Sequence, residues 1–96
     1  LPSQEIELMD YKHRFGSYLK LKPTTISKAS EIAMKFQSKP QVRGKKPKTL
    51  IAVALYLAGQ SNDDPRTQRE ITNATGVIEV TIRKRSKEFR SFLLDS

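Results

Sequence analysis

Residues 50–58 of this chain are apolar without interruption, in the order LIAVALYLA. A helix over this segment has no polar face, and such a helix is stable in water only when other elements surround it. Pro47 suits the first turn, because its missing N–H has no intrahelical partner there. A segment of about 12 residues is too short for a bilayer, which needs roughly 20. We therefore predict the central helix of an all-α bundle, starting at Pro47 and ending at Gly59.

Apolar residues at helical spacing predict four further helices around this segment. They are expected at residues 4–19, 23–37, 67–75 and 79–94, and no segment shows the alternation typical of a strand. Ser3 is predicted to be the N-cap of the first helix, and Gly16 to mark a close helix crossing. We assign the aromatic residues of the first two helices to the core: Tyr11, Phe15, Tyr18 and Phe36.

The size of the chain and its residue types exclude several classes of function. With 96 residues it is expected to form a single domain, residues 1–96, and the missing initiator Met indicates a piece of a longer protein. There is no cysteine, which excludes disulfides, thiolate zinc sites and cysteine nucleophiles. His13 is the only histidine, and we interpret Asp63 and Asp64 as a loop and helix-start feature rather than a catalytic dyad. We expect no enzyme activity, no cofactor and no metal.

Positive charge is concentrated in two parts of the chain. Eighteen Lys and Arg against ten Asp and Glu give a net charge of +8. Residues 11–48 hold eleven of these bases and one acid, whereas residues 1–10 hold three acids and no base. A second cluster of five bases lies between Val80 and Phe92. Clustered positive charge is typical of proteins that bind nucleic acids, although it also occurs on surfaces without a partner.

Residues 67–94 have the spacing of a helix-turn-helix. Thr67 and Glu70 form a capping-box pattern at the start of the first helix. Gly76 supplies the positive φ that the turn needs. Apolar residues occupy the inward positions: Ile71, Val77 and Ile82. Together these features favour a DNA-binding unit over the simpler alternative, a helical hairpin with a solvated basic face.

In a helix-turn-helix, the first turns of the second helix enter the major groove of DNA. The outward positions there are Glu79, Val80, Arg83, Lys84 and Lys87, while Ile78 stands where a Ser or Thr cap is common. Arg83 can pair with O6 and N7 of guanine, and Val80 can contact a thymine methyl group. We predict contacts to the DNA backbone, which position a protein without specifying a sequence, from Thr67, Gln68, Thr81, Lys84, Arg85 and Lys87.

Four stretches of the sequence, which together span about residues 10–92, match one family in order. They are Arg14-Phe15 with Leu19-Lys20-Leu21, then Gly44-Lys45-Lys46-Pro47, then residues 51–58, and then residues 66–71 with residues 76–83. In these stretches the chain resembles the second cyclin-like repeat of transcription factor IIB and of its archaeal counterpart, transcription factor B. The last stretch is the most specific. Lys46 departs from the family pattern, in which Ser is common.

The resemblance implies a five-helix cyclin-like fold with a central third helix and a C-terminal helix-turn-helix. It also implies a role in promoter recognition, in which family members join TATA-binding protein on DNA and read the element just upstream of the TATA box. Val80 and Arg83 fall on the family's base-contacting positions, and Lys45 falls where the family often places a basic residue near DNA. The zinc ribbon and the first repeat of the family are absent from this sequence. In the family these parts provide the recruitment of RNA polymerase and most contact with TATA-binding protein, so we do not expect either role to reside in these residues.

Two functions stay open at this point. The first is a DNA-binding module of a general transcription initiation factor that supports assembly of the preinitiation complex. The second is a cyclin-like protein-interaction module, as in a polymerase III B-related factor or another paralogue, that docks a helix or an acidic segment without sequence-specific readout of DNA. For the first, we expect a monomer whose partners are promoter DNA, TATA-binding protein and, through the full-length chain, RNA polymerase. We expect no binding to a membrane. The expected location is the cytoplasm, at the nucleoid, in an archaeon, or the nucleus in a eukaryote.

Overall fold

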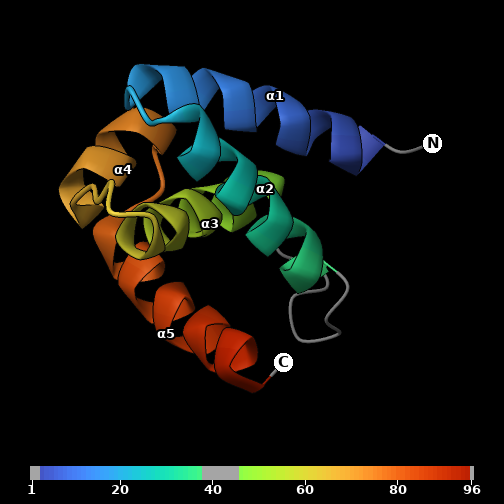
Figure 1. Ribbon diagram of the computed structural model, residues 1–96, viewed down its shortest axis with the longest axis vertical. Coiled ribbons are helices and arrows are strands. Elements are labelled where there is room, and N and C mark those ends of the chain that lie inside the picture. The colour runs from blue at the N-terminus through green and yellow to red at the C-terminus, as the bar shows by residue number, and fades with distance from the viewer. Residues whose placement is uncertain (1–2, 38–45, 96) are drawn as a thin grey trace.

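Helices form the regular structure of the chain, and no strand occurs among the described residues (Figure 1). The computed structural model describes the backbone of residues 3–37 and 46–95 and the side chains of residues 8–37 and 46–91. The helices are α1 (Ser3–Tyr18), α2 (Pro23–Gln37), α3 (Pro47–Ser61), α4 (Gln68–Thr75) and α5 (Glu79–Asp95). The prediction of an all-α chain with five helices is confirmed, with two corrections at helix ends. The first is that α1 includes Ser3 as its first residue, so Ser3 is not the N-cap.

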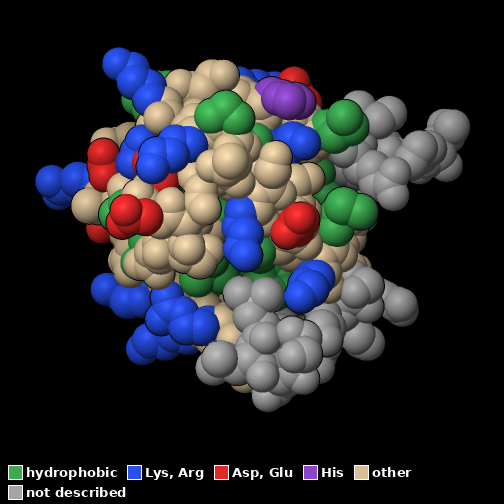
Figure 2. Space-filling model, in the orientation of Figure 1, with side chains coloured by type: hydrophobic (Ala, Val, Ile, Leu, Met, Phe, Trp, Pro, Cys, Tyr) green, Lys and Arg blue, Asp and Glu red, His purple; other side chains and the backbone are tan. Residues whose placement is uncertain are grey.

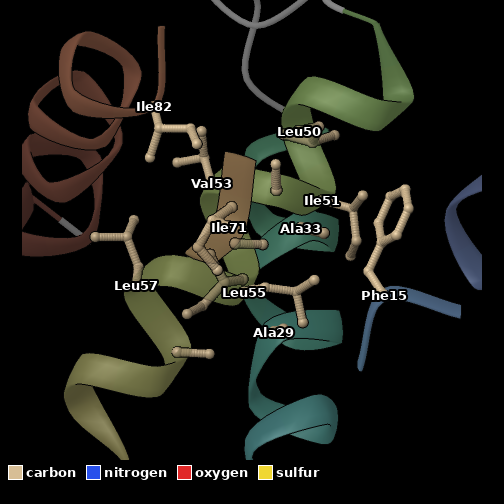
Figure 3. Close-up of a cluster of buried hydrophobic side chains, with 14 of the residues drawn as sticks. Phe15, Ala29, Ala33, Leu50, Ile51, Val53, Leu55, Leu57, Ile71 and Ile82 are labelled. Carbon is tan, nitrogen blue, oxygen red and sulfur yellow. The ribbon is translucent and has the colours of Figure 1, made fainter. Parts of the chain in front are cut away.

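The apolar third helix is central, as predicted. α3 packs against each of the other four helices, and Figure 3 shows its side chains among those of its neighbours. Ala52, Ala54 and Ala58 are fully buried. Because their side chains are small, neighbouring helices can approach the α3 backbone closely. Leu50 and Leu55 are each 1% exposed. Burial on every side explains why this segment needs no polar face.

Gly16 of α1 lies at a close crossing with α2, as the sequence predicted. A Cβ atom at this position would lie 2.7 Å from Cδ1 of Ile26. The two helices are joined by a short turn in which Lys20 has a φ of 57°. The N–H of Leu21 donates to the carbonyl of Gly16 at 3.0 Å, which closes that turn.

The assignment of Tyr18 to the core is wrong, because this side chain is 65% exposed. Leu8 and Phe15 are buried and share one face of α1, and Leu19 is buried in the turn just after the helix. At about 100° per residue, Tyr18 lies about 80° from the direction of Leu8, which is outside that face. Tyr11 lies between the two directions and is half-buried, whereas Phe15 and Phe36 are buried as predicted.

The second correction is that Gly59 does not end α3, which continues to Ser61. The left-handed residue that turns the chain is Asp63, with a φ of 54°. Gly59 is instead buried against the following loop, where a Cβ atom would lie 2.7 Å from the carbonyl oxygen of Asp64. The absence of a side chain at Gly59 therefore allows this loop to pack on α3 before the chain enters α4.

Candidate nucleic-acid interface

The loop before α4 is held in place by the carboxylate of Asp64. This group accepts hydrogen bonds from the N–H of Lys22 at 2.9 Å and from the hydroxyl of Thr25 at 3.0 Å. It also pairs with the guanidinium of Arg66 at 3.0 Å. The hydrogen bond from the Lys22 N–H, followed by those from Thr25 and Arg66, lowers the pKa of Asp64 below its ordinary value against the opposing effect of desolvation. We call these four residues the loop clamp.

Arg66 extends the loop clamp to the end of α1. Its Nε donates to the carbonyl of Leu19 at 3.0 Å, and its Nη2 donates to the carbonyl of Lys20 at 3.2 Å. One guanidinium thus joins the α1–α2 turn to the residue just before the N-cap of α4. The loop clamp thereby fixes where α4 begins relative to the rest of the fold.

The first helix of the predicted helix-turn-helix starts with the capping box that the sequence indicated. The hydroxyl of Thr67 accepts from the N–H of Glu70 at 3.0 Å, and the carboxylate of Glu70 accepts from the N–H of Thr67 at 2.8 Å. The hydrogen bond from the Thr67 N–H lowers the pKa of Glu70. Two N–H groups that a helix start leaves without partners are therefore satisfied by side chains.

The turn between α4 and α5 depends on Gly76. This residue adopts a left-handed conformation, with a φ of 82°, and its N–H donates to the carbonyl of Thr72 at 2.8 Å. The hydroxyl of Thr75 donates to the carbonyl of Ile71 and accepts from the N–H of Val77, at 2.8 and 3.1 Å. Val77 is then buried, as predicted. The turn sends the chain into α5, which packs against α4.

Replacing Gly76 by alanine is expected to lower the free energy of unfolding by about 1–2 kcal/mol, which is the cost of a left-handed conformation for a residue with a Cβ atom. No atom lies within 4 Å of a Cβ built at this position, so the loss comes from the backbone alone. Asparagine tolerates this conformation better, and Gly76→Asn should retain more stability. Chemical denaturation of both variants measures the difference in unfolding free energy. Equal losses for the two variants would contradict the requirement for a left-handed conformation at residue 76.

The inward face of α5 anchors this helix to the core. Ile82 is fully buried, and Phe89 is 2% exposed. The ring of Phe89 lies 4.3 Å from that of Phe36 in α2, measured between centroids. These contacts fix the rotation of α5 about its axis, and so determine which of its residues face solvent.

The outward face of α5 carries the residues that the sequence placed there. Glu79, Val80, Arg83, Lys84 and Lys87 are all exposed, and Val80 is 58% exposed. Figure 2 shows Lys and Arg side chains along the left and lower edges of the molecule, over α4 and α5. An exposed aliphatic side chain and four charged ones therefore share the leading part of one helix.

The remaining predicted contact residues have mixed surroundings. Thr67 is exposed, and Thr81 is half-buried. The half-buried Gln68 donates through Nε2 to the hydroxyl of Tyr56 at 3.4 Å. Arg85 forms an ion pair with Glu88 at 2.7 Å on an edge of α5. Lys45 lies outside the described residues.

The described residues line several grooves, and two of them involve more than one helix. One, of about 550 Å³, is mainly apolar and is lined by residues of α1, α2 and α3 that include the exposed side chains of Met9 and Met34. The other, of about 640 Å³, is lined by Lys28 and Lys35 of α2 and Arg90 of α5. In the described part of the chain, no group of three or more acidic or histidine side chains could hold a metal ion. No helix among the described residues has the length and apolar character that a membrane span requires.

Comparison with known proteins identifies relatives of this chain. The family model described as "Transcription factor TFIIB repeat" matches residues 4–91. Transcription initiation factor IIB of Sulfurisphaera tokodaii is 44% identical over 79 residues, which cover 82% of this chain and 26% of the relative. The protein of the same name from Ignicoccus hospitalis is 39% identical over 87 residues, covering 91% of this chain and 28% of the relative.

The chain thus spans only about a quarter of the length of these curated relatives. Their names are those of transcription initiation factors, which are not enzymes. The match to the family model extends over most of the chain and includes the five helices described above, apart from their outermost residues. This chain therefore belongs to the transcription factor TFIIB repeat family and has its cyclin-like all-helical fold.

Proposed function

We propose that this chain is a DNA-binding module of a general transcription initiation factor, and that α5 reads the promoter element just upstream of the TATA box. The observation that carries the proposal is the position of Val80 and Arg83. Both are exposed on the leading turns of α5, while Ile82 between them is fully buried and anchors the helix. A recognition helix needs this combination, because its outward side chains must reach bases while its inward side holds the helix in place.

The chemistry of the two side chains suits the edges of bases in the major groove. Arg83 offers two parallel N–H donors, which match O6 and N7 of guanine. Val80 offers a stiff branched aliphatic group, which suits the thymine methyl group. Each contact distinguishes one base from the others, so the pair is expected to specify two positions of the element.

Affinity is expected to come largely from the phosphate backbone. Lys84 and Lys87 are exposed beside the two proposed base readers, and Thr67 is exposed at the start of α4. Backbone contacts are also proposed for Gln68, Thr81 and Arg85, and for Lys45. Arg85 would have to exchange its ion pair with Glu88 for a phosphate. Binding should weaken steeply with salt, because each neutralised phosphate releases counterions.

The family context supports a wider role, which we also propose. Residues 1–96 would form one repeat of a longer protein, with the helix-turn-helix at about residues 67–94. Contact with TATA-binding protein and recruitment of RNA polymerase would depend mainly on other parts of that protein, and together they would assemble the preinitiation complex. The relatives named above come from archaea, which favours a cytoplasmic location at the nucleoid.

Replacing Arg83 by alanine is expected to weaken binding to the preferred duplex by about 1–3 kcal/mol and to relax the preference at one base pair. Lys84→Ala is the matched control, because it removes a neighbouring charge that is proposed to contact phosphate. It should weaken binding to all duplexes about equally and lower the slope of log K against log[salt] by about one. Fluorescence anisotropy on the preferred duplex and on each of its single-base variants measures both effects. An equal loss on every sequence for Arg83→Ala would refute base readout by this residue.

A protein-interaction module is the second candidate function, and the groove between α2 and α5 favours it. Lys28, Lys35 and Arg90 line this groove together with the acidic Glu31, and the buried side chains of Ile32 and Leu57 also line it. Three bases against one acid give its rim a net positive charge, which suits an acidic helix or segment. Titration of the chain with a promoter duplex and with random duplex distinguishes the two candidates. A preference for the promoter supports DNA readout, and equal affinity supports the protein-interaction module.

A further inference from the structure

Ile78 is the residue at the leading end of α5 that neither the capping pattern nor the core explains. The N–H of Ile82 donates to the carbonyl of Ile78 at 3.1 Å, and α5 begins at Glu79. Ile78 is therefore the N-cap of α5. An aliphatic residue is among the poorest choices at this position, where Ser, Thr, Asp or Asn would accept a hydrogen bond from the start of the helix. Thr67 provides that function for α4.

The side chain of Ile78 is also not used for packing, since it is 60% exposed. Among the described side chains the exposed large hydrophobic ones are Met9, Tyr18, Met34, Ile78 and Val80. Single exposed apolar residues are ordinary. Ile78 and Val80, however, are separated by one residue at the same end of one helix, and this is the end that a recognition helix inserts into the major groove.

We propose that Ile78 is a second apolar reader of DNA, which contacts the methyl group of a thymine different from the one that Val80 contacts. The inference rests on the proposed function, since it requires α5 to enter the major groove. Thymine presents a C5-methyl group there, and an aliphatic side chain is its natural partner. Ile is branched at Cβ and therefore stiff at χ1, so little side-chain freedom is lost on contact.

The charges around Ile78 favour a nucleic acid over a protein as the partner of this apolar group. Arg83, Lys84 and Lys87 follow on the exposed face of α5, and Glu79 is the one acidic residue in its first turn. A polyanion is attracted by this surface. The same apolar pair on a protein-docking surface would show no dependence on thymine methyl groups, and the experiment below uses this difference.

The test removes one methyl group at a time from the DNA. A duplex is first selected from a random library by the 96-residue chain. Each thymine in it is then replaced singly by deoxyuridine, which keeps the hydrogen-bonding groups of the base and lacks only the methyl. We expect two thymines at which the replacement weakens binding by the wild-type chain about fourfold, the effect of exposing one buried methyl group. Ile78→Ala should abolish the effect at one thymine, and Val80→Ala at the other.

A third variant shows that any loss is not a loss of folding. Ile78→Ser introduces a good N-cap, and it is expected to raise Tm by about 4–8 °C. It should nevertheless lose the same methyl effect as Ile78→Ala. A stabilised variant with impaired discrimination would assign Ile78 to recognition rather than to folding.

Two outcomes overturn the inference, and they differ in what they say of the proposed function. If a sequence is selected but deoxyuridine affects the wild-type chain and Ile78→Ala equally at every thymine, Ile78 reads no methyl group and the proposed function stands. If the chain enriches no sequence from the library, the inference about Ile78 and the proposed function both fail.

Discussion

Replacing Asp64 by alanine is expected to lower the free energy of unfolding by about 3 kcal/mol, because it removes a buried carboxylate from a part-buried ion pair and from two further hydrogen bonds. The carboxylate of Asp64 is 9% exposed, and it accepts from Lys22, Thr25 and Arg66. Its loss leaves the N–H of Lys22 and the guanidinium of Arg66 without this partner. It also removes one link between the α1–α2 turn and the loop before α4, while the hydrogen bonds from Arg66 to the carbonyls of Leu19 and Lys20 can still form. Urea denaturation followed by circular dichroism measures the change.

The neighbouring residue provides a matched control. Asp63 is exposed and has a φ of 54°, a conformation that asparagine tolerates well. Asp63→Asn removes the same charge from the same loop and should change the free energy of unfolding by less than about 0.5 kcal/mol. Similar losses for the two variants would show that Asp64 acts only through surface charge, which contradicts the loop clamp.

The contribution of Asp64 should also depend on pH in one direction. Hydrogen bonds from Lys22, Thr25 and Arg66 hold its pKa in the folded protein below the ordinary value of 3.8. A group with a lowered folded pKa stabilises the protein fully above its unfolded pKa, and this contribution is lost as the pH falls through the folded value. The difference in unfolding free energy between wild type and Asp64→Ala should therefore be constant near neutral pH and narrow below about pH 4.

Replacing Phe89 by alanine is the second change with a large expected effect, about 3–5 kcal/mol of unfolding free energy. Phe89 is 2% exposed, and its ring contacts that of the fully buried Phe36. Alanine leaves a cavity between α5 and α2, so the apolar contact that holds α5 is lost. The outward face of α5, with Val80 and Arg83, depends on this anchor. Binding of a DNA duplex by the variant should therefore decrease as the folded fraction of the protein decreases.

Phe89→Leu tests whether shape or apolar character matters at this position. Leucine fills most of the space, and the expected loss is about 1–2 kcal/mol. The measurement is again the urea midpoint together with the slope of the transition. Equal stability of the alanine variant and wild type would mean that α5 is not anchored through Phe89.

Much of the fold could be predicted from the sequence because its signals are local. The apolar run at residues 50–58 has one physical solution, a surrounded helix. The positions of Pro47, Gly76 and the capping box of Thr67 and Glu70 follow from backbone chemistry within a few residues. They correctly predicted the start of α3 and both ends of α4.

The features that the sequence did not reveal depend on contacts between distant residues. Asp64 bonds to Lys22 and Thr25, which precede it by 42 and 39 residues, and no spacing rule connects such positions. Gly59 was predicted to end α3 because glycine is common after helices. In the structure it gives room to the loop that the clamp holds, while Asp63 makes the left-handed turn.

The outward face of α5 could be predicted only in part. Helical periodicity correctly placed Val80 and Arg83 outside and Ile82 inside. It could not reveal that Arg85 pairs with Glu88 or that Gln68 bonds to Tyr56, because such pairs depend on side-chain conformations. The exposure of Ile78 was signalled only by its departure from the expected Ser or Thr.

The most direct test of DNA reading by α5 is a map of amide chemical-shift changes when the ¹⁵N-labelled chain is titrated with a promoter duplex. We predict that the largest changes fall between Gly76 and Arg90, with Val80 and Arg83 among the most affected. Changes concentrated on Lys28, Lys35 and Gln60, with the leading turns of α5 unaffected, would place the DNA on the α2–α5 groove and contradict the proposed reading of bases.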